Sequence, residues 1–189
     1  MRIGDMEIKT VVVGSYATNC YLLKLGKEVL IVDPGDEFLK IKQEVGSDKV
    51  VGILITHRHF DHIGALDDCI ATYQVPIYDH CNLKEQEYKI GPFHFDVLFT
   101  PGHTDDSVTY YFKDYQFFLV GDFIFCGSIG RMDLGGNETD MKESIRKLYR
   151  FHTSKIEALL LPGHGIHTDL LYEQFTNPYI QRYIGKDGF

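Results

Sequence analysis

The segment Thr56–Gly64, which reads THRHFDHIG, constrains this chain more than any other stretch of its sequence. It follows Val51–Ile55, an apolar run rich in β-branched residues that predicts a buried strand. Within the segment lie four side chains of the kinds that bind metal ions: His57, His59, Asp61 and His62. Because α/β proteins place their sites at the carboxyl ends of strands, this pattern predicts a metal site at the edge of a sheet.

Three more apolar segments end in a side chain of the same kind: His103, Asp122 and His164. The resulting set of seven is too large for one zinc ion, which takes about four ligands. Two ions about 3.5–4 Å apart that share a carboxylate would use the whole set. His57 and His59 point the same way in an extended segment and suit one ion. Asp61 and His62 lie beyond a turn and suit the other ion, and Asp122 has the two oxygens that a bridge needs.

The bulk properties of the chain limit its partners. Its 189 residues are enough for a single domain over residues 1–189 with a sizeable core. The net charge of −8 disfavours nucleic acid and anionic membrane surfaces, because phosphate groups bind to basic faces. No apolar run approaches the roughly 20 residues of a membrane span, and the N-terminal segment lacks the apolar core of a signal peptide. We therefore expect a cytoplasmic protein that acts on a small molecule, and the sequence leaves its oligomeric state open.

The remaining cysteines and histidines receive structural interpretations. No CxxC motif occurs, and in the cytoplasm we expect reduced and mostly buried thiols: Cys20, Cys69, Cys81 and Cys126. Cys126, four residues after Asp122, is interpreted as a small packing residue rather than a nucleophile. Four histidines are interpreted as structural or surface residues: His80, His94, His152 and His167.

The order of elements is that of an α/β (α+β) protein, in which helices separate runs of strands. Gly26-Lys27 predicts a hairpin turn between two strands, and Asp140 with Glu143 resembles a capping box that opens a helix. Three further helical segments are predicted, the last broken at Asn177-Pro178: Glu37–Val45, Ile63–Tyr73 and Asp169–Ile184. A weak echo between Leu98–His103 and Leu159–His164 suggests two related halves.

The run His57–His62, followed in order by His103, Asp122 and His164, resembles the ligand motif of the metallo-β-lactamase superfamily, and the resemblance spans nearly the whole chain. It is greatest to the short members of the glyoxalase II (hydroxyacylglutathione hydrolase)-like branch. Five segments carry that likeness: Thr18–Tyr21, Asp33–Gly35, Pro101–Thr104, Gly127–Arg131 and Asn177–Tyr179. The resemblance implies a four-layer αββα sandwich without the C-terminal helical domain of full-length glyoxalase II, which carries much of the glutathione site.

The resemblance also assigns metal ligands. It places three side chains on the first ion: His57, His59 and His103. It places three on the second ion: Asp61, His62 and His164. Asp122 is then the bridge, and Asp33 matches a position that orients a metal-bound imidazole. Two divalent ions are implied, most simply Zn²⁺, with iron or manganese as alternatives because imidazole and carboxylate suit all three.

The activity implied by the resemblance is hydrolysis of a thioester, with a metal-bridging hydroxide as nucleophile and Asp61 as the catalytic residue that orients it. A thiolate leaving group needs little help from an acid. The carboxylates of Asp105 and Asp106, beside His103, either repel an anionic substrate or face solvent. The acyl group and the thiol therefore stay unspecified.

Two other activities stay open at this point. One is a persulfide dioxygenase whose single iron is held by His57, His103 and Asp122. The other is a hydrolase of another ester, such as a lactone or a phosphodiester. Asp122 stands where zinc β-lactamases usually carry a cysteine, which disfavours β-lactam hydrolysis. A metal-binding scaffold without activity is disfavoured because the set of seven is intact.

Overall fold

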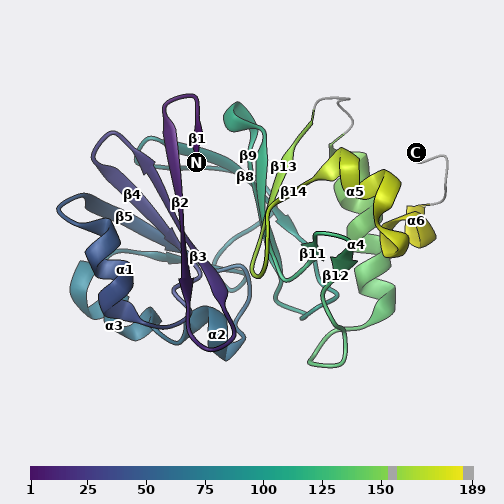
Figure 1. Ribbon diagram of the computed structural model, residues 1–189, viewed down its shortest axis with the longest axis horizontal. Coiled ribbons are helices and arrows are strands. Elements are labelled where there is room, and N and C mark those ends of the chain that lie inside the picture. Colours follow the sequence, from purple (N-terminus) through teal and green to yellow (C-terminus); the bar gives the residue numbers. More distant parts are fainter. Residues whose placement is uncertain (153–156, 185–189) are drawn as a thin grey trace.

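The computed structural model describes residues 1–152 and 157–184. Two six-stranded sheets lie face to face in the middle of the molecule, and helices cover the outer face of each sheet (Figure 1). The fold is therefore the four-layer αββα sandwich that the resemblance implied. No helix in the described part of the chain is both long and apolar enough to cross a membrane.

The first sheet takes its strands in chain order: β1 (Arg2–Ile3), β2 (Met6–Val13), β3 (Thr18–Leu25), β4 (Glu28–Val32), β5 (Lys49–Leu54) and β6 (Ile77–Tyr78). Strands β3 and β4 form the predicted hairpin, in which Leu25 pairs with Glu28. Gly26 in its turn has a φ of 61°, a left-handed conformation that glycine adopts without strain. Strand β5 runs parallel to β4, and the chain leaves its carboxyl end toward His57.

The second sheet contains the later strands in the order β14 (Thr168–Asp169), β13 (Leu159–Pro162), β10 (Phe117–Gly121), β9 (Val108–Phe112), β8 (Phe93–Phe99) and β7 (Glu87–Ile90). Strand β9 is antiparallel to both β8 and β10, and β10 is parallel to β13. Strands β8, β10 and β13 therefore all end at one edge of the sheet. A short hairpin of β11 (Ile124–Phe125) and β12 (Ser128–Ile129) follows β10.

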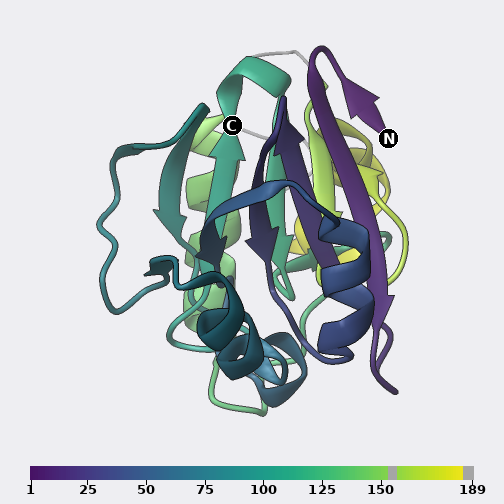
Figure 2. The ribbon, with the colours of Figure 1, turned by 90° about the vertical axis from the view of Figure 1, so that its left-hand side faces the viewer.

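Six α-helices among the described residues complete the layers, together with a 3₁₀ turn at Lys113–Tyr115: α1 (Phe38–Val45), α2 (Phe60–Ile63), α3 (Leu66–Tyr73), α4 (Glu138–Phe151), α5 (Leu170–Thr176) and α6 (Pro178–Ile184). Helices α1 and α3 lie in front of the first sheet in Figure 2, and α4 to α6 cover the second sheet (Figure 1). Three apolar clusters fill the three interfaces between the four layers. The central cluster is rich in phenylalanine, and its rings bind the two sheets together by burial of large apolar surfaces.

One predicted helix is interrupted. The segment Ile63–Tyr73 forms the end of α2 and then α3, with a break at Gly64 and Ala65. A side chain at Gly64 would collide with the backbone carbonyl of Gly35, and the Ala65 N–H donates to the carbonyl of Pro34 at 2.9 Å. The Ala65 N–H thus bonds to a neighbouring segment instead of to a helical carbonyl, which interrupts the helix. Hydrophobic periodicity does not reveal this contact, because it depends on a distant segment.

Three smaller predictions are wrong. The N-cap of α4 is Asn137, whose side chain accepts from the Asp140 N–H at 2.9 Å, so the capping pair begins three residues before Asp140. The two echoing segments end strands of the same sheet, β8 and β13, and therefore do not mark two halves. Only Cys20 and Cys69 are buried, whereas Cys81 and Cys126 are exposed. Cys126 is consequently not a packing residue.

Candidate metal centre

The carboxyl ends of β5, β8, β10 and β13 meet at the lower edge of the sandwich in Figure 1. Backbone hydrogen bonds tie the two sheets together there. The Val108 N–H donates to the carbonyl of Thr56 at 2.7 Å, and the Asn19 N–H donates to that of Gly163 at the same distance. Loops that leave four strands of two sheets are thus held over one small area.

Three overlapping groups of described residues are able to hold a metal ion, and one of them, His57, His62 and Asp122, shares a member with each of the others. The first consists of three histidines and is called the three-histidine group below: His57, His59 and His103. The Nδ1 atom of His59 lies 3.1 Å from Nε2 of His57 and 3.0 Å from Nε2 of His103. Three imidazole nitrogens from two different sheets therefore converge on one point. Such an arrangement is able to hold one divalent ion.

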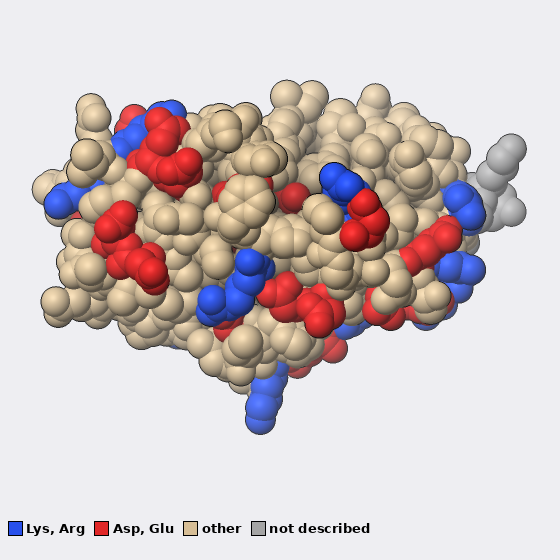
Figure 3. Space-filling view, turned by 90° about the horizontal axis from the view of Figure 1, so that it is seen from below, with Lys and Arg blue, Asp and Glu red and all other residues tan. Residues whose placement is uncertain are grey.

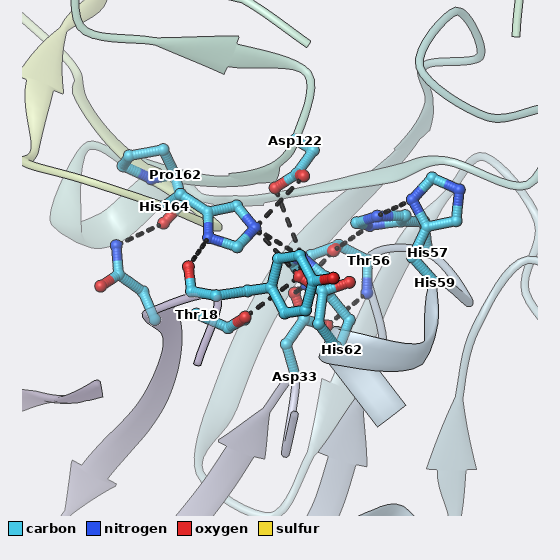
Figure 4. A network of polar contacts seen from close by, with 12 residues as sticks. Thr18, Asp33, Thr56, His57, His59, His62, Asp122, Pro162 and His164 are labelled. Carbon is cyan, nitrogen blue, oxygen red and sulfur yellow. Dashed lines mark hydrogen bonds and ion pairs between the residues drawn. The ribbon is translucent and has the colours of Figure 1, made fainter. Parts of the chain in front are cut away.

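The second donor group contains a carboxylate and is called the Asp61 group below: Asp61, His62 and His164. Nε2 of His164 lies 3.3 Å from Oδ2 of Asp61 and 3.4 Å from Nε2 of His62. His62 is fully buried, and the Thr18 hydroxyl donates to Oδ2 of Asp61 at 3.2 Å. Figure 4 shows His164 and His62 of this group near Asp122.

Asp122 lies between the two groups. Its Oδ2 atom is 3.4 Å from Nε2 of His164 and 3.6 Å from Nε2 of His103, and its Oδ1 atom is 3.3 Å from Nε2 of His62. Burial raises the pKa of Asp122, but the neighbouring His164 and His62 outweigh it and hold the pKa well below its usual range. Among the described residues, its buried Oδ1 atom has no hydrogen-bond partner. A buried acceptor without a donor is what a bound cation would satisfy, so the donor set fits bound metal.

In three of the five rings, the nitrogen that points away from the centre contacts a backbone carbonyl. Nδ1 of His103 donates to the carbonyl of Arg131 at 2.6 Å, and Nδ1 of His164 to that of Tyr16 at 3.0 Å. Nε2 of His59 donates to the carbonyl of Leu134 at 3.2 Å. Because a carbonyl only accepts, these contacts fix the proton on the outer nitrogen and leave the lone pair of the inner nitrogen for a metal.

His62 has a carboxylate in the same role. Its Nδ1 lies 2.9 Å from Oδ2 of Asp33, and Asp33 also accepts from the N–H and the hydroxyl of Thr56 at 2.8 and 2.6 Å. Thr56 is next to Nδ1 of His57, at 3.1 Å from its hydroxyl oxygen. Asp33 is buried and has a φ of 49°, which aspartate tolerates better than most residues. The role expected for Asp33 from the resemblance therefore agrees with its contacts.

The environment shifts the histidines in opposite directions. Burial, together with the nearby His62, lowers the pKa of His57 well below its usual value, and burial likewise lowers the pKa of His103. Burial also lowers the pKa of His62, but Asp33 and Asp122 outweigh this effect and raise it to about 10. The two donor groups thus differ in charge as well as in composition.

An open cleft runs over both groups. Its walls are mostly apolar and aromatic, and they come from the β2–β3 loop, α2, the β11–β12 hairpin and the loop after it: Tyr16, Phe60, Phe125, Ile129 and Leu134. Tyr16 and Phe60 form an edge-to-face pair with ring centroids 5.1 Å apart. In Figure 3, which views this face, charged side chains are scattered and uncharged residues occupy most of the middle.

The sequence analysis missed several contributors. The carbonyls of Tyr16, Arg131 and Leu134 orient three imidazoles, and a backbone acceptor has no sequence signal.

Asp106 accepts from the Arg58 N–H at 3.1 Å, and neither Asp105 nor Asp106 lines the cleft. Of the two roles considered for them, repulsion of a substrate in the cleft is therefore not supported.

Histidine and aspartate donors gathered at the edge of an αββα sandwich define a class of metal-binding proteins. The sequence profile of the metallo-beta-lactamase superfamily matches residues 13–80 and 79–164. The chain therefore belongs to the metallo-β-lactamase superfamily. Its histidine–aspartate cluster contains donor groups that are able to hold a metal ion.

Two curated relatives match nearly the full length. The chain is 38% identical to a probable metallo-hydrolase, YqgX, of Bacillus subtilis (strain 168), over 93% of this chain and 98% of the relative. It is 26% identical to the hydroxyacylglutathione hydrolase GloC of Haemophilus influenzae (strain ATCC 51907 / DSM 11121 / KW20 / Rd), with the same coverage of 93% and 98%. The glyoxalase II-like branch is thus supported only by a distant relative.

Two solved structures are similar at 30% identity. The structure of the B3 metallo-beta-lactamase BLEG-1 has a TM-score of 0.85 and covers 92% of this chain and 99% of its own. The structure of TTHA1623 in a di-iron-bound form has a TM-score of 0.80 and covers 90% and 99%. The fold is therefore that of the superfamily over nearly the whole chain.

Proposed function

We propose that this protein hydrolyses small thioesters with two divalent metal ions, most simply Zn²⁺. The observation that carries the proposal is the convergence of seven donors, six of them in two groups on either side of Asp122. His57, His59 and His103 would hold one ion, Asp61, His62 and His164 the other, and Asp122 both. When bound, the pair would supply a hydroxide nucleophile at neutral pH and polarise the substrate carbonyl.

The chain's own residues orient the reactants. Asp61 is held by the Thr18 hydroxyl and lines the cleft, so its carboxylate is placed to align the attacking water. Tyr16 and Phe60 are 61% and 65% exposed at the cleft, and they offer apolar surface to an acyl group or to the carbon skeleton of a thiol. A thiolate leaves without a proton, so the cleft needs no dedicated acid.

The likeness to GloC supports the thioester as the bond that is cleaved. A small-molecule substrate also agrees with the mainly uncharged cleft and the net charge of −8. The likeness to BLEG-1 makes a β-lactam the appropriate competing substrate in an assay. The likeness to the di-iron form of TTHA1623 makes iron the metal to compare with zinc.

The decisive experiment combines metal analysis with a substrate panel. Protein purified without chelators is analysed for metal per chain, then assayed on a hydroxyacylglutathione, an acyl N-acetylcysteamine thioester, a lactone and nitrocefin. We expect about two ions per chain and preference for the thioesters. A preference for nitrocefin or the lactone would reject the thioester. A single iron per chain with oxygen uptake on a persulfide would instead support the mononuclear dioxygenase.

An Asp61→Asn variant tests the catalytic role. The amide keeps the shape but loses the charge that aligns the water, so kcat should fall by at least about 100-fold. Asp106→Asn is the matched control, because Asp106 lies outside the cleft and an amide oxygen still accepts from the Arg58 N–H. Near-wild-type turnover of the Asp61 variant would contradict the mechanism.

A further inference from the structure

The β11–β12 hairpin lies between two parts of the metal centre. Asp122 precedes it, and Arg131, whose carbonyl holds His103, follows it. Three of its residues, Phe125, Ser128 and Ile129, line the cleft. A displaced hairpin would therefore change the wall that a substrate meets.

The hairpin is too small to hold its own position. It has two residue pairs, Ile124 with Ile129 and Phe125 with Ser128, and an isolated two-stranded hairpin is marginal in water at best. Ile124 and Ile129 pack in the cluster between the second sheet and its helices. This apolar contact is not directional, so it leaves the register of the hairpin tip to polar contacts.

Two fully buried residues of the C-terminal helices supply those polar contacts. Oε2 of Glu173, on α5, accepts from the Gly127 N–H at 3.0 Å. Nδ2 of Asn177, between α5 and α6, donates to the carbonyl of Ser128 at 2.9 Å and to Oε2 of Glu173 at 2.8 Å. The Gly127 N–H and the Ser128 carbonyl are therefore each met by a partner of the right polarity.

Burial of the Glu173 carboxylate is unfavourable unless it is well hydrogen-bonded. Its second oxygen accepts from the Thr168 hydroxyl at 2.5 Å, so three neutral donors surround the group. An apolar residue at this position would avoid the cost of burying a charge but would leave the Gly127 N–H without an acceptor. The acid is therefore explained by its three donors, of which the Gly127 N–H belongs to the hairpin.

We infer that Glu173 and Asn177 are positioning residues that fix the β11–β12 hairpin against the metal centre and so shape the cleft for the apolar part of the substrate. The inference gives the Asn177–Tyr179 motif a role in the site. Neither Glu173 nor Asn177 itself lines the cleft. The inference is tested by hydrogen exchange and by enzyme kinetics. The kinetic test rests on the proposed function, whereas the exchange test does not.

Three variants separate positioning from simple stability. Glu173→Leu removes the acceptor for Gly127. Glu173→Gln restores it, because the amide oxygen can accept from Gly127 and Asn177 while its NH₂ donates to the Thr168 hydroxyl, which is able to accept. Thr168→Val removes a hydrogen bond of the same buried group that does not touch the hairpin. It is the matched control for lost stability.

Hydrogen exchange is measured over residues 124–130, together with metal content. The loss of a hydrogen bond corresponds to about a fivefold change in an equilibrium, so Glu173→Leu should speed exchange in this segment by at least about that factor. Glu173→Gln and Thr168→Val should leave it as in the wild type. Equal exchange in all proteins, or equal acceleration in Thr168→Val and Glu173→Leu, would overturn the inference.

Kinetics on an apolar acyl thioester give the second arm. In Glu173→Leu we expect KM to rise about fivefold with kcat within a factor of about two, since the metal ligands are untouched. Loss of kcat with unchanged KM would count against a cleft-wall role.

If Glu173→Leu does not fold, Asn177→Ser is used, because it removes the contact to Ser128 while keeping an acceptor for the Tyr179 N–H. If the wild type hydrolyses no thioester, the proposed function fails while the exchange data still decide the inference.

Discussion

The two donor groups of the metal centre are built from different surroundings. The three-histidine group is oriented by neutral partners, namely the hydroxyl of Thr56 and the carbonyls of Arg131 and Leu134. In the Asp61 group, His62 is oriented by the buried carboxylate of Asp33. The first group therefore contains no carboxylate, whereas the second contains Asp61 and is oriented in part by the carboxylate of Asp33.

This difference has consequences for metal binding. Burial lowers the pKa of His57, so this ring is already in the neutral form that a metal requires. The pKa of His62 is raised to about 10, because Asp33 and Asp122 outweigh the effect of its burial. A metal at the Asp61 group must displace a proton but gains the stronger basicity that a carboxylate gives to imidazole. The two sites are therefore expected to differ in affinity.

The largest effect is expected at the shared residue. In the proposed mechanism Asp122 is a ligand of both ions, so Asp122→Ala is expected to weaken both sites. Metal content should fall at both sites, and turnover should drop by well over about 100-fold, the upper range for residues that only orient ligands. Elemental analysis and thioester kinetics measure the two effects. Retention of two ions would show that the groups do not share Asp122.

Single-group variants come next. His103→Ala should empty the three-histidine site and leave the Asp61 site filled, and His164→Ala should do the reverse. Each variant is expected to hold about one ion per chain if the groups are separate sites. Competition with a coloured chelator then gives the affinity of the remaining site. The same residual affinity in both variants would remove the contrast between the groups.

Asp33→Asn probes the orienting carboxylate alone. The amide oxygen can still accept from the Thr56 N–H, but the NH₂ group meets Nδ1 of His62 and favours the tautomer with its proton on Nε2. Affinity at the Asp61 site should fall about 10- to 100-fold. The other site should change little, as a metal titration of the variant would reveal. An equal loss at both sites would indicate general damage to the edge of the sandwich.

The smallest effect is expected far from the centre. Tyr115 follows β9, away from the ends of the ligand-bearing strands, and its hydroxyl donates to Oδ1 of Asp5 at 2.8 Å. Tyr115→Phe removes one exposed hydrogen bond, so the free energy of unfolding should fall by no more than about 1 kcal/mol. Thermal unfolding measures this change. Metal content and kinetics should match the wild type, and a deviation would mean that the site is sensitive to remote strain.

Much of the architecture was accessible from patterning. The hairpin turn at Gly26-Lys27, helix α1 and the break at Asn177-Pro178 were predicted because each depends on local residues. The break at Gly64 was not, because it depends on the backbone of Gly35, 29 residues earlier. The N-cap at Asn137 was displaced from the predicted pair by three residues. Local rules therefore located elements better than their ends.

The sequence by itself identified the seven candidate donors, because histidine and aspartate at the ends of apolar strands are chemically conspicuous, and the fold brings all seven together. Only the tertiary structure decided how each ring is turned. The partner that orients His164 lies 148 residues away at Tyr16, and it is a backbone carbonyl that any residue would provide. The anchoring of the hairpin by Glu173 is of the same kind, since it joins side chain to backbone across 46 residues. The sequence therefore determines which side chains are available as donors. The backbone groups that orient those side chains become their neighbours only when the two sheets pack.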